Sequence, residues 1–357
     1  MFKYKLFILC LVYFFSIIFC YAEEYKQIDF KTAIEIAQKN NFDIKASKID
    51  VSVAKNDIKI ANRLQNPSVH TFFNFGEAGR GNPNQVGLSE TVELFKRSPR
   101  KKLAKSKYKL ASTNYEYEKF NLKMDVAEAY IKLIIAKCIL NQYEQQQKYL
   151  EYLFSVSNQD NNKSKLLDVE LGVIQSKIAL NEISTIVNKA KSDTKIARIE
   201  FNKVINSQYS NYDVPDVDIK KLNEFIGLDV PGLSEKLPAF RQIEDTALQN
   251  RYDIKIAKNK INVAENNLTT VVRQLIPDLE IEGGYAYQAA NYSESGTYKS
   301  GAYLSASLVN LPLLYSYKPE IKNAKLELEQ ANINYISTVN KAKKILKLRM
   351  KNLQLHI

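Results

Sequence analysis

Apolar positions recur with two different periods along the chain. Between residues 44 and 61 they return every three or four residues, and the same spacing reappears at 254–271. This spacing aligns them as a stripe along a helix, where small alanines let a neighbouring helix approach closely. We predict a coiled-coil-like helix at each place, with one helix on a globular core as the alternative. The first stripe comprises Ile44, Ser47, Val51, Ala54, Ile58 and Ala61, and off-stripe Ile49, Val53 and Ile60 suggest a second apolar face.

After Pro67 and after Pro277 the period changes to two, which is typical of strands. The alternating segments are 69–75, 85–95, 279–287 and 302–308, and each pair is joined by a polar loop. Strands of about ten residues that are rich in Tyr and Phe fit hairpins of a transmembrane β-barrel. A soluble hairpin is the alternative. Two hairpins cannot close a barrel, so membrane strands would have to pair between subunits.

A long helical stretch begins at Pro99. Its apolar stripe runs through 122–140, a polar break is expected at 155–164, and the helix resumes through 174–204 until Pro215. Each arm has roughly 45–55 residues, or about 70–80 Å at the α-helical rise. Arms of this length cannot surround a compact core, so we predict an extended antiparallel coiled-coil hairpin.

The order helix, hairpin, long helix occurs twice. An offset of 210 aligns 11 identical residues within positions 37–67 without a gap, and an offset of 220 aligns seven more across 99–115. This is an internal duplication. The predicted segments are a signal peptide at 1–22, a first repeat at 23–214, a linker at 215–238 and a second repeat at 239–357. The expected fold is mainly α with a small β part.

Residues 1–22 have the features of a cleaved signal peptide. Lys3 and Lys5 precede the apolar run 6–19, and Ala22 provides a small residue at the expected cleavage point. The run is shorter than the ~20 residues that a membrane-spanning helix requires. We therefore expect the protein to be exported.

The charge of the chain changes this picture little. Its 51 Lys and Arg exceed its 39 Asp and Glu, giving a net charge of +12. The lysines alternate with acids along helices and form no nucleic-acid-binding motif, so we expect no nucleic-acid partner. With two histidines, no nucleophile–base pair, no metal-ligand spacing and no phosphate loop, we expect neither an enzyme nor a cofactor.

The duplicated pattern resembles the TolC family of outer-membrane efflux and secretion channels. The residues that carry the resemblance are Ala33-Ile34, Ala37, Asn40-Asn41, Asp43-Ile44 and Ala46, with Ala247, Asn250, Asp253-Ile254 and Ala257 in the second copy. The segment 90–102, with Glu93-Leu94 and Lys96-Arg97, is most similar to the heavy-metal and cation efflux branch, although Phe95 stands where that branch has glycine.

The resemblance implies a homotrimer in which each subunit gives four strands to one barrel in the outer membrane and long helices to a periplasmic tunnel. It implies passive conduction, with the tunnel tip docked to a periplasmic adaptor and an inner-membrane transporter. The implied tip residues are Asp160, Asn162, Ser164 and Asp168, where Ser164 has helix capping as an alternative role.

A basic cluster follows the second predicted strand. Lys96, Arg97 and Arg100 would lie at the lipid headgroups of the inner leaflet of the outer membrane, with plain solvation of a helix start as the alternative.

The second repeat is shorter than the first. The 220 offset aligns Ile357 with Lys137, so about 70 residues of the first long hairpin have no counterpart. The sequence is compatible with a channel whose second hairpin is shortened or separately encoded, and with a truncated product that does not transport. A third alternative is a periplasmic coiled-coil scaffold or adaptor.

Overall fold

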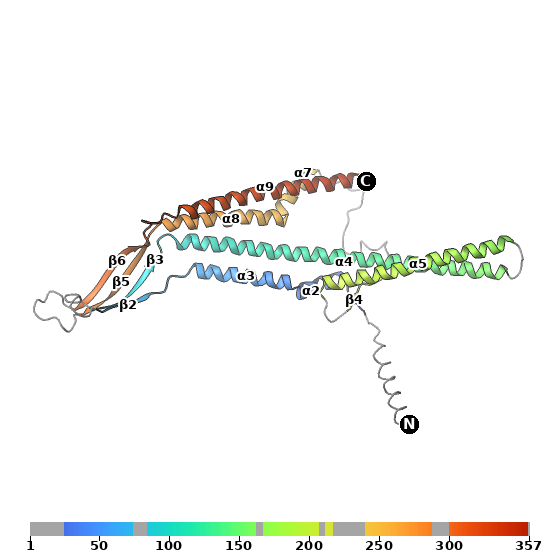
Figure 1. Cartoon of the computed structure of the whole chain (residues 1–357), viewed down its shortest axis with the longest axis horizontal. Helices are drawn as coiled ribbons and strands as arrows, with labels where there is room; N and C mark the ends of the chain where they lie inside the picture. The colour runs from blue at the N-terminus through green and yellow to red at the C-terminus, as the bar shows by residue number, and fades with distance from the viewer. Residues whose placement is uncertain are drawn as a thin grey trace, which may run out of the picture. The chain divides into compact units, whose positions relative to one another are not determined.

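The computed structural model describes residues 25–73, 84–161, 167–206, 211–216, 240–287 and 300–355 (Figure 1). They form two compact units, one from residues up to 44 together with 118–236 and the other from 45–117 together with 237–357. The second unit combines residues of both predicted repeats, whereas the first unit takes none from the second repeat, so the units do not follow the repeat boundaries, which stay a sequence prediction.

The long helix α4 (Arg97–Asn161) has residues 97–117 in the second unit and its remainder in the first unit, where it pairs with α5 (Leu167–Val204). Thr194 Oγ1 lies 3.3 Å from the Ala136 carbonyl oxygen, and Lys191 Nζ lies 3.4 Å from Glu144 Oε1. These contacts show two antiparallel helices, as the periodicity predicted (Figure 1).

The polar break expected at 155–164 is wrong in its extent, because α4 continues to Asn161. Ser155 Oγ donates to the Tyr152 carbonyl oxygen at 2.7 Å. A polar side chain whose hydrogen bond is made to a backbone carbonyl of its own helix does not need to end that helix.

The core of this unit surrounds Tyr130. Its ring meets Phe30, in helix α2 (Phe30–Asn40), at 5.4 Å and Phe201 at 5.8 Å, both edge-on. Its hydroxyl points to the Ile28 carbonyl oxygen at 3.4 Å. Burial, and secondarily the Asp29 charge, raises the pKa of Tyr130 well above its ordinary value. Val126 and Leu133 of the predicted stripe are fully buried nearby.

The segment before α2 and the segment after α5 pair as two short parallel strands, β1 (Lys26–Gln27) and β4 (Tyr212–Asp213). Buried Asp213 accepts from Lys137 at 3.4 Å and from Arg198 at 3.2 Å. The guanidinium of Arg198 also lies over the Tyr25 ring at 4.3 Å. These charges fix the chain beside α4 and α5.

The helices of the second unit are α3 (Phe42–Ala61), α7 (Phe240–Asn250), α8 (Tyr252–Val272) with a 3-10 turn η3 at Arg273–Leu275, and α9 (Lys318–Leu355). Helices α8 and α9 lie side by side (Figure 1). The predicted stripe is buried at Ile254, Ala257 and Ala264. In α3, Ile49, Val53 and Ile60 are each more than half exposed, which agrees with a second apolar face.

Strands β2 (Ser68–Phe72), β3 (Asn84–Val92), β5 (Asp278–Tyr287) and β6 (Gly301–Val309) form one antiparallel sheet in the order β2-β3-β5-β6. All four predicted strands are present. The second was predicted to reach residue 95 but ends at Val92. Phe95 has a φ of 61°, in the left-handed region, and this conformation turns the chain from the strand into α4.

None of the described helices combines the length and the apolar composition that crossing a membrane would require.

Candidate functional site

The sheet has one apolar face. Directly opposed residues share a face of a sheet, and one row crosses all four strands through Val69, Leu88, Gly283 and Leu304. The other large apolar side chains on this face are Val86, Val92, Leu279, Ile281, Tyr285, Tyr287 and Leu308. Glu90 is the one charged side chain that the described strands place there.

This apolar face is exposed to the surroundings of the chain rather than covered by its helices. Leu304 is 80% exposed, and Val69, Leu88, Tyr285 and Leu308 are each at least half exposed. A contiguous exposed apolar surface of this kind marks contact with another protein or with lipid.

The opposite face is mainly polar, although Phe72 and Val309 also lie on it. Its polar side chains are Ser68, His70, Gln85, Ser89, Thr91, Asp278, Glu280, Glu282, Tyr303, Ser305 and Ser307. None of the four described strands contains Lys or Arg, although the chain as a whole is basic. Apolar-out and polar-in alternation is the pattern of a strand between lipid and a water-filled lumen.

A network of hydrogen bonds crosses the polar face. His70 Nε2 bonds to Ser89 Oγ and lies 4.0 Å from Glu280 Oε1. On the other side, Tyr303 Oη donates to Glu282 Oε1 at 2.6 Å.

Gly87 and Gly284 make room for the Tyr303 ring in this network. A Cβ at Gly284 would lie 2.9 Å from Tyr303 Cε1 and 2.6 Å from Gly87 Cα, and closer still to the Val86 carbonyl oxygen. At Gly87 a Cβ would lie 2.5 Å from Tyr303 Oη. The two glycines therefore allow the aromatic ring to cover the backbone of β3 and β5.

The sheet is tied to the helices by a buried ion pair. Lys96 Nζ donates to Asp278 Oδ2 at 2.8 Å, and the two side chains are only 12% and 6% exposed. Asn310 Nδ2 donates to the same oxygen at 3.0 Å. Asp278 therefore connects the exits of both hairpins, since Lys96 follows β3 and Asn310 follows β6.

Two arginines of the predicted basic cluster cap the end of α3. Arg97 Nε donates to the Asn62 carbonyl oxygen at 2.8 Å, and Arg100 Nε donates to that of Ala61 at 3.0 Å. Arg100 Nη1 also pairs with Glu93 Oε1 at 2.6 Å. Cations near a helix C-terminus offset its unpaired carbonyls. The structure thus gives all three basic residues intramolecular roles, and headgroup contact stays a prediction.

The predicted tip residues fall in the sequence from the last turn of α4 to the first turn of α5. Asp160 belongs to the last turn of α4 and Asp168 to the first turn of α5. Asn162 and Ser164, and the side chains of both aspartates, lie outside the described residues. Their role in partner contact stays a prediction.

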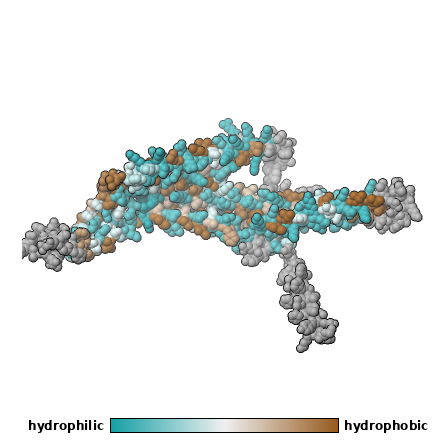
Figure 2. Space-filling model, in the orientation of Figure 1, coloured by the Kyte–Doolittle hydropathy of each residue, from teal (hydrophilic) through white to brown (hydrophobic). Residues whose placement is uncertain are grey.

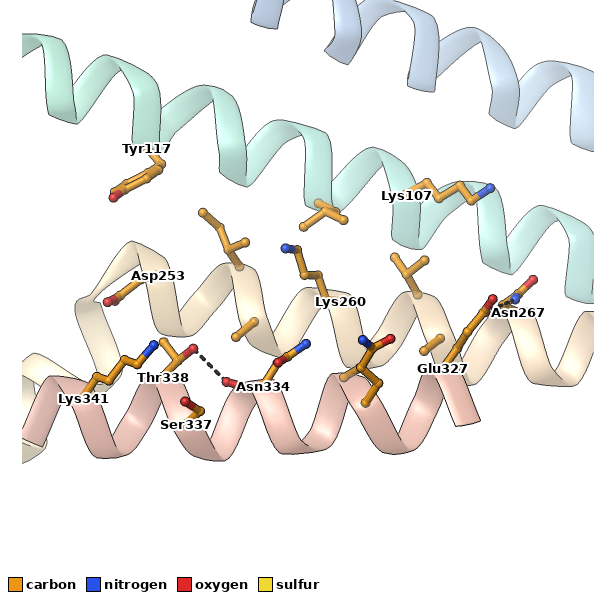
Figure 3. Close-up of a pocket in the computed structure, with 17 residues that line it drawn as sticks. Lys107, Tyr117, Asp253, Lys260, Asn267, Glu327, Asn334, Ser337, Thr338 and Lys341 are labelled. Carbon is orange, nitrogen blue, oxygen red and sulfur yellow. Dashed lines mark hydrogen bonds between the residues drawn. The ribbon is translucent and has the colours of Figure 1, made fainter. Parts of the chain in front are cut away.

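A groove of about 670 Å³ runs between α4 and the α8–α9 pair in the second unit (Figure 3). Its wall includes small and aliphatic residues such as Ala257, Val263 and Ala331, and Asn267 Nδ2 donates to Glu327 Oε2 at 3.0 Å. Figure 3 shows Lys260 near its middle, and Thr338 Oγ1 donates to the Asn334 carbonyl oxygen at 2.8 Å. The groove is a packing gap between helices.

At one end of the groove, Arg251 makes two hydrogen bonds with Asp253, at 3.1 and 2.7 Å. The guanidinium holds the pKa of the Asp253 carboxyl below its ordinary value, and the Ile254 N–H adds to this effect. Within the part of the chain that the structure describes, no three His, Cys, Asp or Glu side chains are placed to hold a metal ion.

Comparison of the sequence with protein-family models gave no match, and comparison with curated proteins gave none. Solved structures do match. CusC, described as forming a transmembrane channel, has a TM-score of 0.66 at 16% identity, over 93% of this chain and 78% of CusC.

Two further matches are outer-membrane channels. MtrE of Neisseria gonorrhoeae has a TM-score of 0.63 at 18% identity, over 92% of this chain and 75% of MtrE. CmeC of Campylobacter jejuni has a TM-score of 0.58 at 16% identity, over 91% of this chain and 73% of CmeC. The chain has the fold of an outer-membrane channel protomer. The expected fold, mainly α with a small β part, is thereby confirmed, whereas the homotrimeric barrel that the resemblance implies stays a prediction.

The sequence pattern did not identify the contacts that organise this site. The alternation of Asp278, Glu280 and Glu282 with apolar residues was a signal for the polar face. The pairing of His70 with Glu280 and of Lys96 with Asp278 depends on strand register, which a single sequence does not contain.

Proposed function

We propose that this chain is one subunit of an outer-membrane channel that conducts solutes passively from the periplasm to the exterior. The sheet lies in the outer membrane in this proposal, and the helices lie in the periplasm. The observation that carries the proposal is the two-faced sheet, with exposed aliphatic residues on one side and an acidic, hydrogen-bonded network on the other.

The sheet requires further copies of the chain to be stable in lipid. Strands β2 and β6 are its edges, and neither has a second neighbour among the described strands. Unpaired backbone groups are costly in hydrocarbon. Pairing β6 of one subunit with β2 of the next, in a ring of three, would close a barrel and satisfy both edges.

The helices offer matching surfaces for such a ring. Ile49 and Val53 on α3, and Ile333 and Ile336 on α9, are each more than half exposed. Burying them between subunits would remove apolar area from water at about 25 cal/mol per Å². A homotrimer therefore uses exposed surfaces on both the sheet and the helices.

The energy for transport would come from partners. The resemblance implies a periplasmic adaptor and an inner-membrane transporter, docked at the turn between α4 and α5. The chain itself contributes the conduit and its lumen. Neither catalysis nor a cofactor is part of this role.

The test is to express the full chain with its leader, fractionate the membranes and record from purified protein in planar bilayers. We expect a detergent-requiring, heat-modifiable trimer in the outer-membrane fraction and stepwise conductance. A soluble monomer would overturn the proposal. A membrane-inserted trimer without conductance would instead favour the non-transporting product considered from the sequence.

A further inference from the structure

An apolar loop leaves the sheet between β6 and α9. Its sequence from Leu311 to Tyr315 is Leu-Pro-Leu-Leu-Tyr, in which Leu313 is 81% exposed and Leu314 is fully exposed. Figure 2 shows hydrophobic side chains gathered where, in Figure 1, β6 leads into α9. Exposed leucines next to each other in a monomer require an apolar partner.

The loop is held with its leucines outward. At its start, Asn310 has a φ of 57° and donates to buried Asp278. The Leu313 N–H donates to the Leu311 carbonyl oxygen at 2.8 Å, which forms a tight turn. At its end the Tyr315 ring packs edge-on against Tyr317 at 5.2 Å. The outward placement of Leu313 and Leu314 therefore rests on fixed contacts on both sides.

The first hairpin has a corresponding feature. Leu94 and Phe95 align with Leu314 and Tyr315 through the 220-residue offset of the repeat. Phe95 is 70% exposed and has a φ of 61°. Both hairpins thus leave the sheet through an exposed aromatic residue that follows a leucine.

We propose that the 311–315 loop, together with Phe95, inserts into the inner leaflet of the outer membrane and anchors the channel at the level where strands become helices. The inference rests on the proposed function. The loop continues the apolar face of the sheet. Val92 and Leu308 lie in the last row of that face, at the end of the strands from which the chain enters the helices, and both are exposed.

The surroundings of the loop fit phospholipid. Tyr315 has an apolar ring and a hydroxyl, which suits the boundary between headgroups and acyl chains. Lys318 and Lys322 follow on α9 and are exposed. Lysines beside an apolar segment attract lipid phosphates. This combination of leucine, tyrosine and lysine is typical of an interfacial anchor.

The chain contains no tryptophan, so one introduced tryptophan reports on its position alone. Three full-length single variants would be reconstituted in phosphatidylcholine vesicles: Leu314→Trp in the loop, Leu304→Trp on the apolar face and Lys344→Trp at an exposed position in the C-terminal half of α9. Brominated phosphatidylcholines with bromines at shallow or deep positions of the acyl chain then quench the emission. Leu313→Trp serves as a second loop reporter.

We expect loss of Leu314→Trp emission to be greatest with shallow bromines, with a shift of its maximum to shorter wavelength. Leu304→Trp should respond more to deep bromines, and Lys344→Trp should change little. If Leu304→Trp is quenched while both loop reporters are not, the anchor is wrong and the channel proposal stands. Blue-shifted but unquenched loop reporters would mean that protein covers the loop, which also overturns the anchor. If no reporter is quenched, the membrane location of the sheet fails, and the anchor fails with it.

Discussion

Two neighbouring glycines of β5 lie on opposite faces of the sheet and have different surroundings. A Cβ at Gly284 would meet the backbone of β3 and the Tyr303 ring, whereas one at Gly283 would lie 3.7 Å from the nearest atom, Leu304 Cδ1. Forcing extra volume into a packed site costs about 1–3 kcal/mol. We predict that Gly284→Ala lowers the free energy of unfolding in detergent by this amount, as measured by denaturant titration.

Gly283→Ala is the matched control for this substitution and should leave the unfolding midpoint nearly unchanged. It places the same methyl group on the adjacent residue of the same strand, so propensity effects cancel. Equal destabilisation by both variants would show that the Tyr303 packing is not the cause.

The Arg251–Asp253 pair makes stability depend on pH at acidic values. Because the folded pKa of Asp253 is lowered, the pair stabilises the fold above the ordinary carboxyl pKa of about 4, and this contribution is lost as the pH falls through the lower folded value. We predict that Asp253→Asn costs about 0.5–1 kcal/mol at pH 7, since the pair is partly exposed.

The difference between wild type and Asp253→Asn should shrink as the pH falls through the lowered folded pKa of Asp253, as measured by urea titrations at a series of pH values. The repeat provides the control, because Asp43 aligns with Asp253 while Asn41 stands in place of Arg251. Asp43→Asn should therefore lower the free energy of unfolding at pH 7 by less than Asp253→Asn does. A pH-independent loss in Asp253→Asn would contradict the ion-pair explanation.

At the scale of elements, the Lys96–Asp278 contact links the sheet to the helices. Lys96→Met would leave a buried carboxylate without its cation, and Asp278 Oδ1 already lacks a hydrogen-bond partner in the described chain. Removing one member of a buried pair costs about 3–5 kcal/mol. We predict a loss of this order in unfolding titrations.

Lys102→Met is the control for Lys96→Met, because Lys102 is an exposed lysine on α4, six residues after Lys96. It should change the unfolding free energy by no more than about 0.5 kcal/mol. If the two variants behaved alike, the junction between sheet and helices would not depend on the pair.

The assignment of one sheet face to lipid and the other to the lumen can be tested with two adjacent substitutions in β6. Leu304 lies on the apolar face and Ser305 on the polar face. A lysine on the lipid face of a barrel costs about 2–4 kcal/mol near the midplane, whereas lumen positions tolerate charge. We predict that Leu304→Lys strongly reduces the amount of heat-modifiable protein in the outer membrane and that Ser305→Lys does not. The opposite ranking would invert the assignment of the faces.

For the whole molecule, assembly should depend on exposed apolar residues that contribute little to the fold of the isolated chain. We predict that the double variant Ile49→Ser with Ile333→Ser lowers the temperature at which the trimer dissociates on gels, while helix content by circular dichroism is unchanged. The matched control is Lys48→Ser with Asn332→Ser, at exposed neighbouring positions. Loss of helix content in the apolar double variant would instead place these residues in the monomer core.

The number and type of elements could be predicted because they depend on local periodicity. The stripe at Ile254, Ala257 and Ala264 is buried as its spacing requires, and the four strands lie where period two was found. The duplication also predicted that both hairpins would be followed by a long helix. The extents were less accurate, as the continuation of α4 through Ser155 to Asn161 shows.

The tertiary structure decided which strands are neighbours and which side chains meet. Pairing of β3 with β5 joins the two hairpins into one sheet, and its register sets Tyr303 over Gly284 and Gly87. The same fold turns Arg97 and Arg100 towards the end of α3. Local spacing constrains only residues a few positions apart, whereas these contacts join residues far apart in the chain. Their geometry follows from packing the whole sheet against its helices, which no single segment of the sequence encodes.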